Sequence, residues 1–213
     1  MSNHLINRLH FGSNAAAILK YLRSKSDDGL GPSQFSFNAI RLMPDPLNLP
    51  NHPMVQRLSL MNSDWSAFND KVSAFALRRL GHHNSHRRTD EKIEEAIEDL
   101  RCKTSSMEFI NGLSERHIFD QAVANYRHFG FFASFDWRLA NWGTVADVCS
   151  VGKSTFKLPT SCIEFTTQWT PPIFAIQTLA DTFPSVRFEL FYRYAPDEPF
   201  TKIEFFPTVP FGY

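Results

Sequence analysis

The fold is decided by residues 161–194, which read SCIEFTTQWTPPIFAIQTLADTFPSVRFELFYRY. Apolar and polar residues alternate over 162–169, apolar residues recur at helical spacing over 173–183, and alternation returns over 186–194. These periods predict a strand, a helix and a second strand. The stretch is therefore half of a two-layer α+β domain.

The ends of the predicted helix are marked by the residues around it. Thr170 is predicted to cap its start, with Pro171 and Pro172 in the first turn, where missing amide donors cost nothing. A short tail strand is predicted over 202–205, where polar and apolar residues alternate again, and it is expected to pair at an edge of the sheet.

A matching pattern opens the chain. Alternation predicts a strand over 4–11, with Leu5, Leu9 and Phe11 on one side. A helix follows over about 15–22, and a second strand is predicted over 34–42. Strand, helix and strand at each end predict a ferredoxin-like split β-α-β sheet with helices on one face.

In the middle of the chain, apolar residues recur at helical spacing instead of alternating. Prolines at four positions between residues 44 and 53 predict an extended connector to about residue 60. Three helices follow: one from Trp65 to Phe75, one after a cap at Thr89, and one from Ser114 to about His128 that ends at Gly130. We therefore predict an α+β domain made of residues 1–59 and 131–213, with residues 60–130 as a helical insertion.

Composition narrows the function classes. The chain has 22 basic and 22 acidic residues, so no global charge draws it to nucleic acid or to an anionic membrane. Three widely spaced cysteines without a Cys-x-x-Cys motif argue against a disulfide framework and a zinc ribbon. No run approaches the roughly 18 apolar residues of a membrane span, and the first residues lack an apolar signal core. We expect a cytoplasmic protein without a membrane partner.

Motifs at three places carry a resemblance to a known family. They are Asn141-Trp142-Gly143-Thr144 with Trp137 upstream, Phe165-Thr166 and Trp169 followed by Pro171-Pro172, and Phe183-Pro184 before an aromatic strand. With these motifs the chain resembles the ferredoxin-like domain family of phage and plasmid proteins typified by YubB. The resemblance covers about residues 1–48 and 125–200. Family members usually carry a Lys and a second Trp where this chain has Val145 and Ala146.

The resemblance implies residence on a mobile genetic element. Small proteins of such elements often act against host defence systems such as restriction or CRISPR. The family name describes a fold and not iron–sulfur chemistry, and three scattered cysteines could not supply the usual four thiolates of a cluster. We therefore expect no cofactor.

The tryptophan corner is the first candidate for partner binding. Its indoles offer rigid contact area, and two polar side chains would add specificity. The residues are Trp137, Asn141, Trp142 and Asp147. The alternative is a structural corner, with Trp at a sheet edge, Asn forming a turn and Gly143 at positive φ.

The second candidate is the basic segment 78–88, which could bind phosphates or an acidic protein face. Its side chains are Arg78, Arg79, His82, His83, His86, Arg87 and Arg88. The alternative is a solvated turn, partly neutralised by the glutamates that follow. The three histidines could also serve a metal-dependent hydrolase, although Asn84-Ser85 and Gly81 argue against a rigid helix that would hold them as ligands.

Evidence for catalysis is absent from the motifs. Cys149 near Asp147 is a candidate nucleophile, but no histidine is placed by sequence to activate it, so an inert thiol is the alternative. We predict a non-enzymatic mobile-element protein that binds a host protein or nucleoprotein complex through its insertion and inhibits a defence system. The alternative is a nucleic-acid binder that uses an aromatic sheet and the basic segment. The sequence leaves the oligomeric state open.

Overall fold

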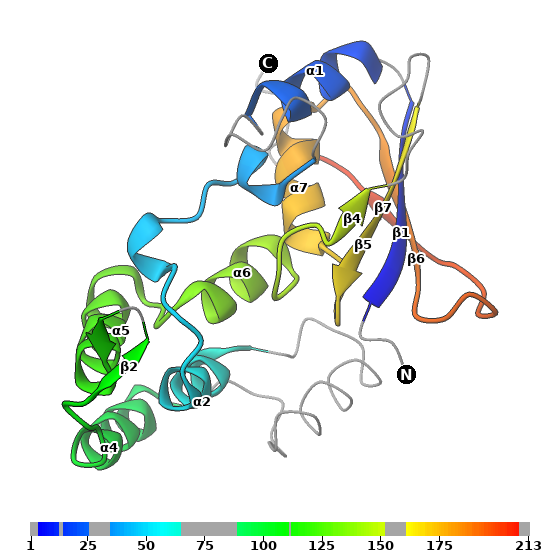
Figure 1. The fold of residues 1–213 in the computed structure, drawn as a ribbon. Coiled ribbons are helices and arrows are strands. Elements are labelled where there is room, and N and C mark those ends of the chain that lie inside the picture. The colour runs from blue at the N-terminus through cyan, green and yellow to red at the C-terminus, as the bar shows by residue number, and fades with distance from the viewer. Residues whose placement is uncertain are drawn as a thin grey trace. The chain divides into compact units, whose positions relative to one another are not determined.

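The computed structural model of the chain describes residues 4–12, 15–25, 35–64, 89–110, 112–151 and 161–208. It divides the chain into two compact units (Figure 1). Met1–Leu42 and Asn141–Tyr213 form the sheet unit, and Met43–Ala140 form the helical unit. The predicted α+β class is confirmed.

The sheet unit is organised around its first strand. β1 (His4–Phe11) pairs antiparallel with β5 (Cys162–Gln168) on one side and with β6 (Phe188–Arg193) on the other. α7 (Ile173–Thr182) joins β5 to β6, so these two parallel strands enclose β1. This is the predicted split β-α-β unit.

Two shorter strands complete the sheet. β4 (Ser150–Val151) pairs with β5 at one edge, and β7 (Thr201–Phe205) pairs with β6 at the other. The strand order is therefore β4-β5-β1-β6-β7, with every neighbouring pair antiparallel. The predicted edge strand at the tail is confirmed as β7.

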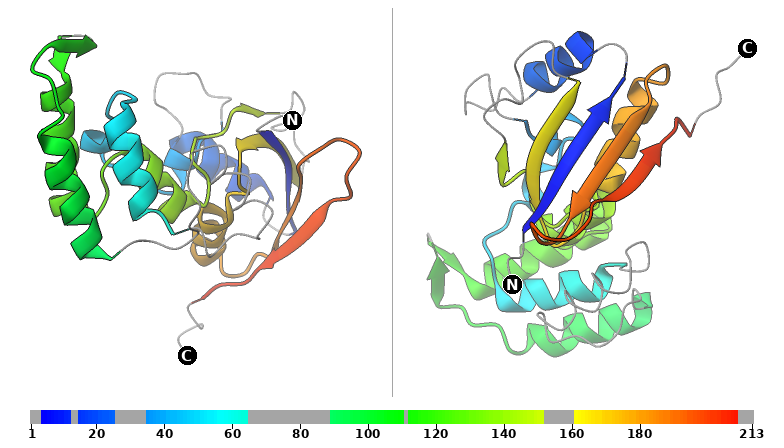
Figure 2. Two further views of the ribbon diagram at one scale, coloured as in Figure 1. Left: turned by 90° about the horizontal axis from the view of Figure 1, so that it is seen from below. Right: turned by 90° about the vertical axis from the view of Figure 1, so that its right-hand side faces the viewer.

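Helices cover one face of this sheet. Figure 2 shows α1 (Ala15–Lys25) and α7 on the same side of the strands. On that side β1 buries Leu5, Leu9 and Phe11, as its alternation predicted. Asn7 is on the same buried side, and its Nδ2 donates to Thr167 Oγ1 over 3.0 Å. The other face carries the polar side chains of the strands.

The strand predicted over 34–42 is wrong. The described part of this stretch holds a 3₁₀ helix, η1 (Phe37–Ala39). Ser36 Oγ accepts from Asn38 N, and Asp147 Oδ1 accepts from Phe37 N over 2.8 Å. These bonds satisfy amides that a strand would pair with a neighbour. Phe35 and Phe37 are still buried, so the apolar alternation that suggested a strand serves packing alone.

The predicted cap at Thr170 is also wrong. α7 begins at Ile173 with Pro172 as its N-cap, and Thr170 Oγ1 is buried without a hydrogen-bond partner among the described residues. A residue that precedes a proline is disfavoured in helical conformation. With two successive prolines at 171 and 172, the helix therefore begins only after the second proline.

In its described residues the helical unit contains mostly helices and one small hairpin. Its elements are η2 (Asp45–Leu47), α2 (Pro53–Asn62), α4 (Asp90–Arg101), β2 (Glu108–Ile110), β3 (Leu113–Ser114), α5 (Glu115–Phe129) and α6 (Ser134–Trp142). The last two residues of α6 belong to the sheet unit. The helix predicted from Trp65 to Phe75 lies outside the described residues.

Helix ends in this unit follow the sequence signals. Thr89 is the N-cap of α4, and Ser114 caps α5 by accepting from His117 N over 3.1 Å. Gly130 ends α5 in the left-handed conformation, with φ 77°. The predicted connector to residue 60 is wrong in its last part, because Pro53 occupies the first turn of α2.

An apolar core joins three helices of this unit. Side chains from α2, α4 and α5 meet there, including Leu58, Ile97 and Phe119, and none of these three is exposed to solvent. The predicted insertion, 60–130, falls inside this unit. The unit extends further at both ends: it takes in η2 and α2, where the sequence suggested a connector, and most of α6, which was predicted as part of the α+β domain.

Candidate functional site

The tryptophan corner is buried. Trp137 is on α6 rather than at a sheet edge, and both Trp137 and Trp142 are largely excluded from solvent. Trp142 Nε1 donates to Arg41 O over 2.9 Å, and its ring lies 5.8 Å from that of Phe37. These two indoles therefore fill the protein core and offer little surface to a partner.

The polar residues of the corner fix its geometry. Gly143 has φ 86°, and a Cβ added there would lie 2.8 Å from Ile173 N. Asn141 is buried, and Thr144 Oγ1 donates to Gln168 O over 2.9 Å. The carboxylate of Asp147 accepts from Phe37 N and from its neighbour Val148 N, and also from Ser36 Oγ. These bonds favour the structural alternative, with both tryptophans on α6 rather than at a sheet edge, and the assignment of the four corner residues to partner binding stays a prediction.

The basic segment lies outside the described residues. This holds for Arg78, Arg79, His82, His83, His86, Arg87 and Arg88. Their assignment to partner or phosphate binding stays a prediction.

Asp136 is the most deeply buried carboxyl group of the described chain. Burial raises its pKa, while hydrogen bonds from Asn62 Nδ2 and from the amides of Phe132 and Ala133 lower it, at 2.8 to 3.0 Å. Asp136 is the third residue of α6, so its carboxylate satisfies amides at the helix start. All of its partners belong to the protein framework, which favours a structural role over a catalytic one.

An exposed apolar surface lies on the β2–β3 hairpin. Five large apolar side chains are exposed in the described chain, and three of them lie in this hairpin or directly before its first strand. Met107 is 78% exposed, Phe109 43% and Ile110 40%. We call these three residues the hairpin patch. Neighbouring exposed apolar residues on a short projecting element are typical of a protein contact surface.

The hairpin patch is held on a fixed base. The ring of Phe109 meets the buried ring of His52 edge to face, with centroids 4.8 Å apart. His52 Nε2 lies 3.5 Å from Glu115 Oε1, and the other oxygen of Glu115 accepts from Ser105 N over 3.1 Å. Leu113 packs against the core of the helical unit. A contact surface anchored in this way loses little conformational entropy on binding.

The helix that precedes the hairpin is strongly acidic. α4 carries six carboxylates against two basic side chains, and all six carboxylates are exposed. Three pair with nearby cations: Glu94 with Arg127 over 4.0 Å, Glu98 with Arg101 over 3.4 Å, and Asp99 with Lys103 over 2.6 Å. The described surface of α4 therefore presents an excess of negative charge.

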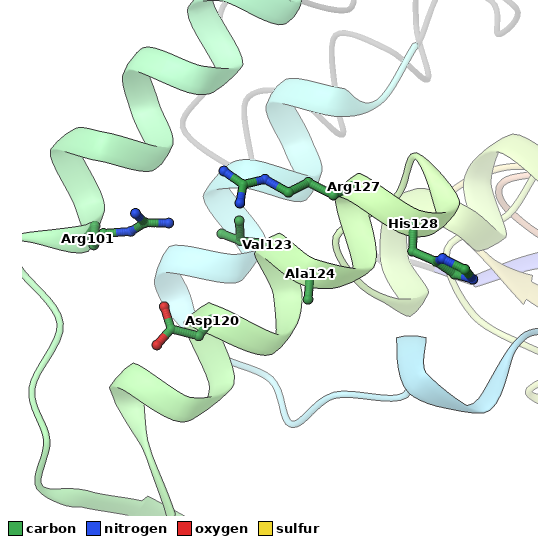
Figure 3. Close-up of a pocket in the computed structure, with 6 residues that line it drawn as sticks. All are labelled: Arg101, Asp120, Val123, Ala124, Arg127 and His128. Atoms are coloured by element: carbon green, nitrogen blue, oxygen red, sulfur yellow. The ribbon is translucent and has the colours of Figure 1, made fainter.

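A shallow groove of about 530 Å³ runs between α4 and α5. Figure 3 shows Arg101 and Arg127 reaching into the space between the helices, with Asp120 on the same side and His128 pointing away. Both guanidinium groups already pair with glutamates of α4. The groove consequently has no strong preference for an anion or a cation.

The face of the sheet opposite the helices carries alternating charges. Its cations are Arg8, Arg187, Arg193 and Lys202, and its carboxylates are Glu164, Glu189 and Glu204. Arg8 pairs with Glu164 over 2.7 Å, and Lys202 lies 2.7 Å from both Glu189 and Glu204. Two aromatic rings, Phe191 and Phe200, lie among these charges. Nearly balanced and mutually paired charges do not form a phosphate-binding field.

The cysteines divide into two kinds of environment. Cys149 is exposed as a residue, but partial desolvation of its thiol, together with the nearby Asp147 charge, raises the pKa of Cys149. Cys162 lies opposite His10 in the β1–β5 register, with Sγ 3.4 Å from Nε2. Partial burial also raises the pKa of Cys162, although Arg8 opposes the shift and Glu164 adds to it. Raised thiol pKa values argue against a cysteine nucleophile at either position.

The described residues also lack two further kinds of feature. No group of three or more His, Cys, Asp or Glu side chains in the described ranges is placed to hold a metal ion. None of the described helices is both long enough and apolar enough to cross a membrane.

The hairpin patch was missed from the sequence although a signal for it exists. Asn111-Gly112 is a dipeptide typical of tight hairpin turns, and apolar residues flank it on both sides. Gly112 has φ 77°, as such a turn requires. The Cys162–His10 pair was missed because it depends on strand register, which alternation alone does not fix.

Comparison with known proteins gives no assignment. No family model matches the chain, and no curated protein matches it. One solved structure that matches is the crystal structure of a protein api92 from Yersinia pseudotuberculosis, titled with the family DUF1281. It has a TM-score of 0.36 and 9% sequence identity, over 96% of this chain and 94% of that chain. A likeness at this level carries no argument about function.

Proposed function

We propose that this chain is a non-enzymatic protein that binds another protein through the hairpin patch of its helical unit. In keeping with the resemblance to YubB-type proteins, we propose a phage or plasmid origin and inhibition of a host defence complex as its role. One observation carries the proposal: Met107, Phe109 and Ile110 are all exposed within four residues of one hairpin and its approach, and Phe109 also packs against buried His52.

Exposure of such side chains is costly without a partner. Full burial of a large apolar side chain contributes roughly 1.5–3 kcal/mol. Met107, at 78% exposed, keeps most of that gain for a partner, whereas Phe109 and Ile110, at 43% and 40%, keep less than half of it. The inward residue of the hairpin, Leu113, already packs on the core of the unit. The outward residues are therefore available to a partner while the base stays fixed.

The charge of α4 supports one class of partner. Six exposed carboxylates complement a basic surface and speed the approach of a positively charged protein. We propose a partner that has an apolar pocket beside a basic area, as in proteins that handle nucleic acid. Nuclease and helicase components of defence complexes have surfaces of this chemistry.

The test begins by crosslinking the partner to a defined position on the surface of the protein. A photo-crosslinking residue at position 109 should label one host protein, which mass spectrometry then identifies, whereas the same residue at position 206 should not. The purified partner is then titrated with wild-type protein and with the variant Met107→Ser, Phe109→Ser, Ile110→Ser. We expect the variant to lose affinity by roughly a hundredfold or more.

A matched control separates specific binding from general stickiness. Leu42 and Phe206 are exposed apolar residues of the sheet unit, at 75% and 61%. The variant Leu42→Ser, Phe206→Ser should bind the partner as wild type does. Equal binding by the hairpin variant and wild type, with both folded by circular dichroism, would exclude the hairpin patch as the binding surface.

The defence role has its own readout. Cells with an active restriction or CRISPR system are challenged with a targeted phage while they express the protein. We expect wild-type protein and the Leu42/Phe206 control to raise the plating efficiency of the phage, and the hairpin variant to fail. If wild-type protein protects no phage but still binds a partner, the binding proposal stands and the defence role is withdrawn.

The second candidate is a nucleic-acid binder that uses the outward face of the sheet. His10 and Phe191 meet edge to face at 5.2 Å, and Arg8 and Arg193 lie over the Phe200 ring at 4.8 and 4.6 Å. Such groups can stack on bases. A single-stranded oligonucleotide titration at low salt tests this reading, with loss of binding expected for Phe191→Ala. Absence of binding at low salt would retire it.

A further inference from the structure

The last strand of the sheet unit, β7, is an edge strand. Figure 2 shows it beyond β6, and no described strand pairs with its other side. An edge strand presents backbone N–H and C=O groups that can pair with another chain. The opposite edge strand, β4, has only two residues, so β7 is the edge that is long enough to accept a further strand.

Two features that usually prevent edge-to-edge pairing are missing from β7. The strand contains no proline, and its pairing with β6 runs over residues 201–205 without a shift in register. The described tail after β7 is bonded to α7 instead of lying along the edge. Gln177 Nε2 donates to Phe206 O over 2.7 Å, and the Thr208 amide donates to a carboxylate of α7 over 2.8 Å.

The side of β7 that faces the helices is apolar and incompletely covered. Ile203 and Phe205 lie opposite Leu190 and Phe188 in the register, on the face that the helices cover. Leu190 is fully buried, whereas Ile203 is only half-buried. The apolar layer therefore continues to the edge of the sheet, where a further strand would bury more of it.

The outward side of β7 carries a charge pattern that complements itself. Lys202 and Glu204 are exposed on this side, with Ile203 between them in the sequence. When two copies of one strand pair antiparallel about a twofold axis, the residue on the axis lies opposite itself and its two neighbours lie opposite each other. With the axis at Ile203, Lys202 of each copy lies opposite Glu204 of the second copy.

Other registers of this pairing are disfavoured. Moving the axis by one residue places Lys202 opposite its own copy, or Glu204 opposite its own copy, and like charges directly opposite are destabilising. An axis between two residues would place helix-facing residues opposite outward-facing ones. The chain has 22 basic and 22 acidic residues, so no overall repulsion opposes the association of two copies.

We propose that β7 is a self-association surface, through which two copies of this chain join their five-stranded sheets into one continuous antiparallel sheet about a twofold axis at Ile203. Two Lys202–Glu204 pairs form across the axis on the outward face, and the two Ile203 side chains meet on the other. This inference goes beyond the proposed function and does not rest on it, because the hairpin patch and β7 belong to different units.

Sedimentation velocity of the full chain measures the association. Between about 1 µM and 1 mM, the range in which small interfaces associate, wild-type protein should shift from monomer to dimer. Lys202→Glu and Glu204→Lys each place like charges opposite each other in both pairs, so each should weaken the dimer by roughly tenfold or more. Wild-type protein that stays monomeric over this range would overturn the proposal.

Restoring the charge complementarity distinguishes this register from a general charge effect. An equimolar mixture of Lys202→Glu and Glu204→Lys should dimerise, since every lysine then lies opposite a glutamate. The double variant Lys202→Glu, Glu204→Lys keeps the net charge of wild type and should dimerise by itself. If the double variant is as weakly associated as the single variants, with all of them folded by circular dichroism, the proposed register is wrong.

Disulfide crosslinking reports the register directly, even for a weak dimer. In the background Cys102→Ser, Cys149→Ser, Cys162→Ser, which has no native thiol, Ile203→Cys places two thiols opposite each other and mild oxidation should link two copies. The matched control is Thr201→Cys, which is exposed but whose two copies lie four residues of strand apart, about 13 Å. Equal crosslinking at the two positions would overturn the assignment.

The hairpin patch is the competing surface for a second copy. The variant Met107→Ser, Phe109→Ser, Ile110→Ser should dimerise as wild type does. If this variant is monomeric while the charge variants of β7 still dimerise, the second copy occupies the hairpin patch, and the β7 proposal is overturned.

Discussion

Replacement of Gly143 by alanine is the sharpest test of the corner that joins α6 to the sheet unit. Gly143 has φ 86°, a conformation that costs an L-residue about 1–2 kcal/mol. The added Cβ would also lie 2.8 Å from Ile173 N and 3.1 Å from Pro171 O. Backbone atoms cannot swing aside as a side chain can, so we expect about 1–3 kcal/mol more from overpacking.

The expected loss of stability for Gly143→Ala is therefore about 2–5 kcal/mol. Urea unfolding followed by far-UV circular dichroism and by tryptophan fluorescence measures it, because Trp142 precedes the substituted residue and is buried. The comparison that isolates the close contact is Gly130→Ala. Gly130 has φ 77°, but a Cβ there meets nothing within 4 Å, so only the conformational part remains.

A double variant separates the side-chain contact of the added Cβ from its backbone contact. Ile173→Ala removes the side-chain atom that lies 3.1 Å from the added Cβ, but it leaves the 2.8 Å contact with the Ile173 amide. The loss caused by Gly143→Ala should therefore persist in the Ile173→Ala background. If Gly143→Ala loses no more stability than Gly130→Ala, the close approach of the corner to the start of α7 is not a constraint on the fold.

Three smaller predictions concern single side chains. Asp136→Asn should destabilise the helical unit by about 2–4 kcal/mol in urea unfolding, because an amide NH₂ would replace one acceptor that faces buried donors. Ser114→Ala removes the cap of α5 and should cost about 1 kcal/mol by the same measurement. Hydrogen bonds from the Thr208 amide and then its hydroxyl keep the pKa of Asp181 below its usual value. The bonds from Thr208 to Asp181 of α7 should therefore be fully formed above the ordinary aspartate pKa. They should be lost as the pH falls through the lowered pKa of Asp181, and the NMR chemical shift of the Thr208 amide would report this loss.

The strands of the sheet unit could be predicted because their burial is periodic. β1 buries alternate residues against the helices, and β5 and β6 do the same, so alternation carries their identity. Prediction failed at 34–42 because buried Phe35 and Phe37 have the same spacing in a capped 3₁₀ turn as in a strand. Ser36 caps this turn locally, but the bond to Phe37 N comes from Asp147, more than a hundred residues away, and no local pattern reports it.

Site prediction was weaker for a related physical reason. The tryptophans were predicted to bind a partner because they are large aromatic residues, yet both Trp137 and Trp142 are buried in the core. The exposed apolar residues Phe109 and Ile110 belong to a strand of only three residues, which precedes a turn dipeptide. Composition cannot separate a core aromatic from a surface one when tertiary packing decides which is covered.

The central position of β1 has a consequence for biosynthesis. Its register places Asn7 opposite Phe165, 158 residues later in the chain, so β1 is synthesised long before the strands that pair with it. The helical unit is complete much earlier and can fold in the interval. Until β5 and β6 are synthesised, the apolar side of β1 is a natural target for chaperones, and a chain terminated prematurely after residue 140 would leave that strand as an aggregation-prone tail on a folded body.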